Sequence, residues 1–183
     1  MKIILVRHGK HESETHNGKL LSKGKKQAKL LSKKLKKNSI KEIYSSDLER
    51  ARETAEILKN KLKIPLTITV VLREWESKTI KQDRKKWKKE DKDNLKRLDK
   101  FLNEITKNKE ENLLIVAHGQ LNKIIMARLL NINPVKLVPF MQDNTGMDVL
   151  EWNEYFHNWR LILMNDTSHL DNNLSKFLIK YRK

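Results

Sequence analysis

Two stretches decide the fold: MKIILVRHGK at residues 1–10 and ENLLIVAHGQ at residues 111–120. Each has a short apolar run rich in branched side chains and ends in His-Gly. Such runs are typical of strands that are buried on both faces of a parallel sheet. If the two strands are parallel neighbours, His8 and His118 leave the sheet at one carboxyl-terminal edge, where open α/β sheets bind ligands. The sequence thus predicts one site made from two distant segments.

The length of 183 residues predicts a single domain, 1–183, with one core. The chain has no cysteine, which excludes disulfides and thiolate chemistry. Its first residues do not form a signal peptide, and no apolar run approaches the ~20 residues of a membrane span. We therefore expect a soluble, cytoplasmic protein with no membrane partner.

The charge balance is strongly basic, with 40 Lys and Arg against 23 Asp and Glu and a formal net charge of +17. A field of this sign attracts phosphates of any kind. The lysines are spread along the chain and alternate with leucines at helical spacing, so we interpret them as solvated helix faces rather than a nucleic-acid surface. We expect a small phosphorylated substrate and no nucleic-acid partner. The sequence does not determine the oligomeric state, and a dimer is compatible with it.

The first half of the chain alternates predicted strands and helices. Ser22 is expected to cap the first helix, and the second helix ends before Ile64-Pro65. The predicted elements are strands at 3–6, 42–45 and 66–72, with helices at 23–37 and 48–62. This alternation predicts an α/β fold, a three-layer αβα sandwich with a mostly parallel central sheet.

The second half begins with a lysine-rich segment at about 77–110 that interrupts this alternation. We predict that it is a short helical cap insertion, helical mainly at 95–105. The elements expected after it are a strand at 113–116, a helix at 121–130, hairpin strands at 147–152 and 159–164, and a basic tail at 176–183 that is a short helix or a frayed end.

The triplet Arg7-His8-Gly9 directly follows the first apolar strand. A neutral imidazole can attack phosphorus through one ring nitrogen while the other holds its proton against a carbonyl. The adjacent guanidinium is a planar fork that matches phosphoryl oxygens, and glycine allows a sharp turn. The triplet therefore indicates phosphoryl chemistry more strongly than a lone histidine would.

The stretch SSDLERARETA at 45–55 crosses from a strand into a helix. Asp47 is expected to cap this helix, which puts Arg50 in the first turn, facing the strand-end edge. The positive end of the helix dipole disfavours an arginine there unless an anion binds between them. Arg52 is interpreted as an exposed arginine paired with a neighbouring glutamate.

Six ordered blocks resemble the histidine phosphatase superfamily, which includes cofactor-dependent phosphoglycerate mutases, broad-specificity phosphatases, alpha-ribazole phosphatases and phosphohistidine phosphatases. The resemblance extends over most of the chain and leaves out only the cap and the tail. The blocks are VRHG at 6–9, LSKGKKQA at 21–28, YSSDLERARETA at 44–55, LRE at 72–74, VAHG at 116–119 and NTGMDVLEW at 144–152.

The resemblance implies that His8 is the nucleophile and becomes phosphorylated. Glu74 would protonate the leaving oxygen and later deprotonate the attacking water. Positive charge in the pocket would stabilise the equatorial oxygens during in-line transfer, so that no metal and no cofactor are needed. The phosphate-binding positions implied are Arg7, Arg50, His118 and Gly119.

The sequence departs from the family pattern after RHG. The family usually has Glu-Thr and then an asparagine that helps to bind phosphate, whereas this chain reads KHESE at 10–14. Asn17 or Ser13 is a candidate substitute from a loop of different length. The glycine-rich continuation often found after LxE is also missing, which makes Glu76 an alternative to Glu74 as the proton donor.

Several other histidines need an interpretation. His11 and His16, with Glu12 and Glu14, are disfavoured as a metal cluster because alternating residues in a loop give no fixed ligand geometry. His157 and His169 are expected at the surface.

The sequence leaves open the role of one pair of tryptophans. It assigns another pair of residues by motif position only. Trp75 and Trp87 either line a substrate lid or anchor the cap to the core. Asn144 and Thr145 are expected to support the site beside His118.

The favoured function is a phosphomonoester hydrolase acting through a phosphohistidine on a small phosphorylated metabolite or a phosphoprotein. The alternative is a phosphoglycerate mutase, which usually carries a longer, proline-rich insertion; this chain has three prolines and no such run. A second alternative is a non-catalytic protein that binds phosphate or nucleic acid. It is disfavoured because a binding module needs neither a nucleophile nor a proton donor.

Overall fold

The computed structural model describes residues 1–12, 17–82 and 84–171, and the predicted basic tail at 176–183 lies outside them. The strands are β1 (Lys2–Arg7), β2 (Ile40–Ser46), β3 (Leu66–Thr69), β4 (Asn112–Ala117), β5 (Met147–Asn153) and β6 (Asn158–Asp166). The α-helices are α1 (Ser22–Leu35), α2 (Glu49–Leu62), α3 (Ser77–Ile80), α4 (Lys89–Ile105) and α5 (Gly119–Leu129). Short 3-10 turns span Val70–Leu72, Arg84–Lys86 and Pro134–Leu137.

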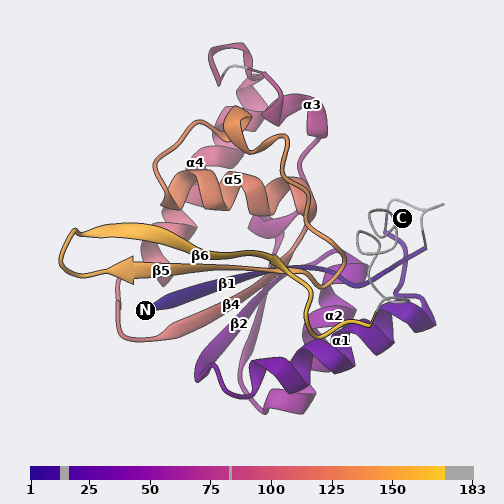
Figure 1. Cartoon of the computed structure of the whole chain (residues 1–183). Helices are drawn as coiled ribbons and strands as arrows, with labels where there is room; N and C mark the ends of the chain where they lie inside the picture. The colour runs from indigo at the N-terminus through magenta and orange to yellow at the C-terminus, as the bar shows by residue number, and fades with distance from the viewer. Residues whose placement is uncertain (13–16, 83, 172–183) are drawn as a thin grey trace, which may run out of the picture.

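The six strands form one sheet in the order β3-β2-β4-β1-β5-β6. β3, β2, β4 and β1 are parallel, and the β5–β6 hairpin continues the sheet in antiparallel fashion. Figure 1 shows α4 and α5 on one face of the sheet and α1 and α2 on the other. The predicted α/β sandwich is confirmed. Within the described part of the chain, no helix has both the length and the apolarity to cross a membrane.

The apolar run of β1 is buried on both faces because its side chains alternate between two cores. Ile3 and Leu5 belong to the core under α4 and α5, whereas Ile4 and Val6 belong to the core over α1 and α2. β4 is the parallel neighbour of β1, with Arg7 opposite Ala117. His8 and His118 therefore leave the sheet side by side, as the two quoted stretches predict.

The segment at 77–110 divides into two parts. The apolar face of α4 packs in the same core as β1, through Leu95, Leu98 and Leu102. This helix is thus a layer of the sandwich, and the cap is reduced to the residues before it. Trp75 and Trp87 are both buried, with ring centroids 5.6 Å apart in an edge-to-face contact, and they hold the cap against the core.

Two helix starts and one strand end differ from the prediction. Ser22 does not cap α1, because it lies within the first turn and Leu21 precedes it without a side-chain cap. Asp47 does not cap α2, because an ion pair with the guanidinium of Arg73 engages its carboxylate, with Nη2 and Oδ2 2.6 Å apart. The predicted strand at 66–72 stops at Thr69, whose side chain accepts a hydrogen bond from the next turn.

Candidate active site

His8 is buried at the end of β1, and its hydrogen bonds define its tautomer. Nδ1 lies 2.8 Å from the Gly9 carbonyl, which can only accept, so Nδ1 carries the proton. Nε2 accepts a hydrogen bond from Arg50 Nε at 3.2 Å and therefore has a lone pair. Burial holds the pKa of His8 well below its ordinary value, and the positive charge of its neighbours lowers it further. The ring is thus a neutral imidazole whose Nε2 faces the guanidinium of Arg50.

Arg50 reaches His8 from the first turn of α2, as the sequence predicts. The start of this helix is held by Asn17, whose Oδ1 accepts from the Glu49 amide at 2.6 Å. Burial lowers the pKa of the Arg50 guanidinium. Arg52 points elsewhere and pairs with Glu49, with Nη2 and Oε2 2.7 Å apart, which confirms its interpretation as an ordinary surface arginine. Asn17 thus contacts the start of the helix that carries Arg50.

His118 is fully buried at the end of β4 and faces His8, with ring centroids 5.2 Å apart. Its Nε2 lies 3.0 Å from the hydroxyl of Ser46, which also accepts from the Leu48 amide at 3.2 Å. Ser46 ends β2, the other neighbour of β4. The carboxyl ends of three parallel strands therefore meet at this pair of histidines.

Arg7 is the last residue of β1 and directly precedes His8. Its Nη1 donates to the Gln142 carbonyl at 2.8 Å, and its side chain lies against Gly119. The Gln142 side chain in turn donates to the carbonyl of Leu5 at 3.1 Å and accepts from Asn122 at 2.8 Å. A buried amide network thus fixes Arg7, and the sequence offered no signal for Gln142 because its partners are far away in the chain.

Glu74 lies at the amino terminus of α5, where its Oε1 accepts from the amides of Gln120 and Leu121 at 3.2 and 3.1 Å. Burial raises the pKa of Glu74, although the amides of Leu121 and Trp75 and the charges of the nearby arginines oppose the rise. Glu76 is exposed and pairs with Lys78, with Oε2 and Nζ 2.7 Å apart. Of the two predicted proton donors, Glu74 is the one next to the arginines.

The turn after His8 requires glycine for steric reasons. A Cβ on Gly9 would lie 2.8 Å from the Gly24 carbonyl, and a Cβ on Gly24 would lie 2.1 Å from the Lys10 carbonyl. The Gly9 amide donates to the Thr54 hydroxyl at 3.0 Å. The first turn of α1 and the middle of α2 thus clamp the loop that carries His8.

The segment before β5 supports the first histidine rather than the second, contrary to the sequence prediction. Asn144 Nδ2 donates to the His8 carbonyl at 3.0 Å, and the Thr145 amide donates to the Arg7 carbonyl at 2.8 Å. Thr145 has a left-handed backbone, with φ 60°. Because β5 pairs with β1 and not with β4, the residues that precede it reach only the β1 exit.

His169 is not the surface residue that its polar context predicts. Its Nε2 lies 3.1 Å from the Thr145 hydroxyl, and burial lowers its pKa to about 4. The contact arises because the chain returns after β6 to the same loop. His157 is exposed in the hairpin, as predicted.

His11 lies at the rim of the site, with its ring centroid 4.8 Å from that of His8 in an edge-to-face contact. The sequence did not predict this contact. His16, Glu14 and Ser13 lie outside the described residues, so their predicted or disfavoured roles stay untested. Among the described residues, no group of three His, Asp or Glu side chains has the arrangement of a metal site.

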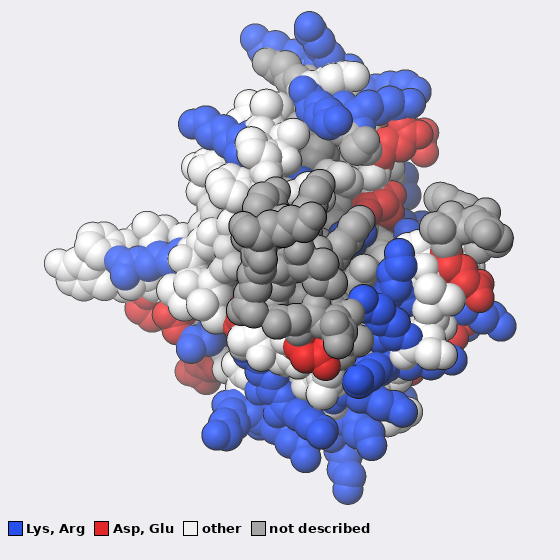
Figure 2. Space-filling view, turned by 45° about the vertical axis from the view of Figure 1, so that its right-hand side comes forward, with Lys and Arg blue, Asp and Glu red and all other residues white. Residues whose placement is uncertain are grey.

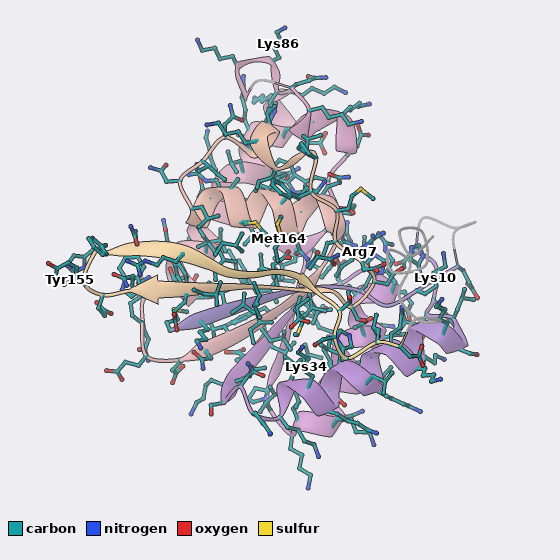
Figure 3. All side chains as sticks on the ribbon, viewed as in Figure 1. Arg7, Lys10, Lys34, Lys86, Tyr155 and Met164 are labelled. Carbon is teal, nitrogen blue, oxygen red and sulfur yellow. The ribbon has the colours of Figure 1, made fainter. Side chains whose placement is uncertain are left out.

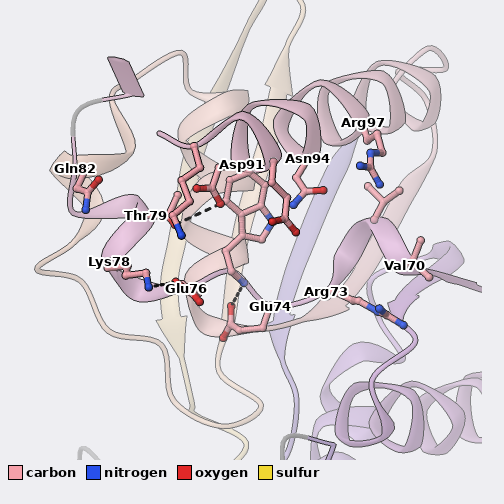
Figure 4. Close-up of a pocket in the computed structure, with 14 residues that line it drawn as sticks. Val70, Arg73, Glu74, Glu76, Lys78, Thr79, Gln82, Asp91, Asn94 and Arg97 are labelled. Atoms are coloured by element: carbon pink, nitrogen blue, oxygen red, sulfur yellow. Dashed lines mark hydrogen bonds and ion pairs between the residues drawn. The ribbon is translucent and has the colours of Figure 1, made fainter. Parts of the chain in front are cut away.

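A polar cavity of about 500 Å³ lies beside Glu74, between α4 and the segment that follows β3. Figure 4 shows Asp91 and Asn94 of α4 on one wall and Glu74 and Glu76 on the other. Basic side chains also line it: Arg73, Lys78, Lys88 and Arg97. Glu74 is the one predicted catalytic residue among the residues that line this cavity.

The chain belongs to the histidine phosphatase superfamily, branch 1, whose family model matches residues 3–167. The paired histidines and the two arginines described above lie within the residues that this family model matches. No curated protein sequence matches the chain.

The solved structures similar to this chain include three phosphatases. A phosphoserine phosphatase from Entamoeba histolytica, in complex with 3-phosphoglyceric acid, is 22% identical, with a TM-score of 0.76 over 93% of this chain and 99% of that chain. A mycobacterial glucosyl-3-phosphoglycerate phosphatase with inorganic phosphate is 20% identical, with a TM-score of 0.75 over 93% and 99%. A putative alpha-ribazole-5'-P phosphatase from Escherichia coli is 20% identical, with a TM-score of 0.74 over 91% and 98%.

Proposed function

We propose that this protein hydrolyses phosphomonoesters through a phosphohistidine on His8, without a metal ion. The observation that carries the proposal is the state of the imidazole: the Gly9 carbonyl holds the Nδ1 proton, and Nε2 keeps its lone pair beside Arg50. Membership in a phosphatase superfamily supports the same reaction. A protein that only binds phosphate has no need for a buried nucleophile in this tautomer.

In the first step, the Nε2 lone pair of His8 attacks phosphorus and the bond to the leaving oxygen breaks. Glu74 donates its proton to that oxygen, and its raised pKa favours the protonated form that this step needs. Since the Gln120 and Leu121 amides occupy Oε1, proton transfer is expected on Oε2. In the second step, water attacks phosphorus and gives a proton to Glu74, and the N–P bond breaks to release phosphate.

The positive charge of Arg7, Arg50 and His118 would stabilise the phosphoryl oxygens throughout. Arg50 donates to His8 and the His118 ring faces it, while the Arg7 side chain lies against Gly119. The expected substrate is a small phosphorylated metabolite or a phosphoprotein. Since Glu74 protonates the leaving group, the neighbouring cavity is where we propose that a polar leaving group binds.

The test is a panel of phosphomonoesters assayed for free phosphate, combined with mass spectrometry of the protein after a rapid alkaline quench. We expect phosphate release and a phosphoryl group on His8, and neither of them in His8→Asn. A mutase would interconvert phosphoglycerates faster than it releases phosphate. Absence of turnover on every ester, with salt-dependent binding to duplex DNA, would instead favour the non-catalytic alternative.

A further inference from the structure

Thr145 has a backbone conformation that is unusual for a β-branched residue. Its φ is 60°, in the left-handed region, and the residue is fully buried. It is the third residue of the turn at 143–146, in which the Gly146 amide donates to the Asp143 carbonyl at 2.9 Å. A turn with positive φ at this position favours glycine or asparagine there, and a β-branched residue is strained. Strain of this kind persists only where surrounding contacts hold it, and it is concentrated at functional sites.

The turn bonds to the two residues at the exit of β1. The Thr145 amide donates to the Arg7 carbonyl at 2.8 Å, and the Gly146 carbonyl accepts from the Arg7 amide at 3.4 Å. Asn144 Nδ2 donates to the His8 carbonyl at 3.0 Å. A displacement of the turn therefore displaces the backbone of Arg7 and His8.

The segment after β6 contacts the turn from the other side. Nε2 of His169 lies 3.1 Å from the Thr145 hydroxyl, and Oδ1 of Asn165 accepts from the Asp143 amide at 2.7 Å. The main chain of Thr145 thus bonds to β1, while its hydroxyl bonds to the segment after β6. Both sides of the strained residue are engaged.

This segment is itself fixed to α1. Asp166 pairs with Lys34, with Oδ2 and Nζ 2.6 Å apart, and Leu170 is buried. Figure 3 shows Lys34 on α1 next to the chain that leaves β6. α1 contains several lysines and no acidic residue, and Figure 2 shows basic side chains gathered at the lower end of the molecule, where α1 and α2 lie in Figure 1. Such a surface attracts an acidic side chain, which holds the segment, and with it His169, in place.

We propose that His169 is a positioning residue for the phosphoryl transfer at His8. Its bond to the Thr145 hydroxyl holds the left-handed turn, and the turn fixes the backbone of Arg7 and His8. A threonine at position 145 supplies the hydroxyl that glycine lacks. This role of His169 rests on the proposed function, because the position of His8 affects the rate only if His8 attacks phosphorus.

The first test compares kcat/KM for p-nitrophenyl phosphate in variants at the two ends of this bond. His169→Ala and Thr145→Val each remove the bond and keep a β-branched residue at position 145, so each should lower kcat/KM about 10-fold, since small displacements of reacting groups are costly. The double variant should lose no more than either single variant, because both changes remove the same bond. His169→Gln, whose amide can replace Nε2, should keep most of the rate.

Thr145→Gly separates the strain from the bond. Glycine adopts the left-handed conformation without a side-chain contact, so this variant should keep most of the rate. In this background, His169→Ala should have no further effect. An equal loss in Thr145→Gly and Thr145→Val, or an unchanged rate in His169→Ala, would overturn the proposal.

His157→Ala is the matched control. His157 also has a positive φ, 47°, but it is exposed in the hairpin between β5 and β6, so its loss should leave kcat/KM unchanged. Urea unfolding verifies that each variant is folded under the assay conditions, which separates a loss of stability from a loss of rate. A loss in His157→Ala equal to that in His169→Ala would contradict a specific role for His169.

The second test does not depend on turnover. Nitrogen NMR of the chain with isotope-labelled histidine reports which ring nitrogen of His8 carries the proton, and His8→Asn identifies the signals. The unmodified chain and Thr145→Gly should hold this proton on Nδ1, whereas His169→Ala and Thr145→Val should populate the other tautomer, because a displaced loop weakens the bond from Nδ1 to the Gly9 carbonyl. Unchanged His8 signals in both of these variants would contradict the positioning role even in an active enzyme. Altered signals in a chain that releases no phosphate would support the contact between the turn and His8 and contradict only the proposed function.

Discussion

The two His-Gly exits look alike in the sequence but differ in the structure. His8 is followed by a loop clamped between α1 and α2, and its ring is fixed by a carbonyl on Nδ1 and a guanidinium on Nε2. His118 directly precedes α5, whose first amides hold Glu74. The first exit therefore presents a lone pair, and the second presents a helix amino terminus and the carboxyl group bound to it. Two strand ends of similar sequence thus carry groups of different chemical character.

The largest effect is expected at the first exit. His8→Ala should lower kcat by at least about 10⁴-fold on every ester, because the nucleophile is lost. Phosphate release from p-nitrophenyl phosphate measures the loss. If His8→Ala keeps the rate of the unmodified chain, the nucleophile assignment is wrong.

Glu74→Gln should cost about 10³-fold on alkyl phosphates, within the range of general acid–base catalysis, and much less on p-nitrophenyl phosphate, whose leaving group needs no proton. Because the pKa of Glu74 is raised, kcat/KM for alkyl phosphates should fall as pH rises through that pKa and the acid ionises. The variant should lack this decline. Glu76→Gln is the matched control, and an equal loss in the control would reverse the choice between the two glutamates.

His118→Ala should lower kcat by about 10²-fold, which is typical for the loss of one group that stabilises transition-state charge. Unlike His8→Ala, this variant should still form a phosphohistidine, only more slowly. Mass spectrometry after an alkaline quench distinguishes the two histidines. Complete absence of the phosphorylated species in this variant would mean that the two histidines do not have the separate roles proposed here.

The two exits should also differ in how strongly a glycine-to-alanine substitution destabilises the fold, because only the loop after His8 is clamped. Gly24→Ala should lower the free energy of unfolding by about 3 kcal/mol, because its methyl group meets the Lys10 backbone. Gly119→Ala is the comparison at the second exit, where the nearest atom is 3.7 Å away, and it should leave stability almost unchanged. Urea unfolding of both variants measures the difference. Equal destabilisation would show that the first exit is not more tightly packed.

The smallest effect concerns Asp148, which lies on β5 opposite Leu5 of β1 and accepts from the Asn165 amide at 2.7 Å. Burial raises its pKa to about 6. Between about pH 4 and 6 the folded chain holds a proton that the unfolded chain has lost, so stability falls as pH rises through this window. Asp148→Asn should therefore gain at most about 3 kcal/mol at pH 7 and almost nothing at pH 4. Calorimetry at both pH values checks this, and a gain that is equal at both would exclude ionisation as the cause.

The sequence by itself determined the α/β alternation, the parallel pairing of β1 with β4 and the position of Arg50. These features depend on local pattern: short buried runs, helical spacing, and residues at the ends of elements. It also identified the superfamily, because the six blocks occur in order. The catalytic roles of His8, Glu74 and His118 stay predictions.

Only the tertiary structure decided which distant groups hold the site together. Asn144 supports His8 rather than His118, the half-buried His169 contacts Thr145, and Asp47 pairs with Arg73. Gln142 fixes Arg7, and α4 joins the core instead of forming a cap. In each case the two partners are far apart in the chain. They meet because of the order of the strands in the sheet, which the local sequence does not encode. Burial and pairing of polar groups depend on that arrangement, and no spacing along the sequence reports it.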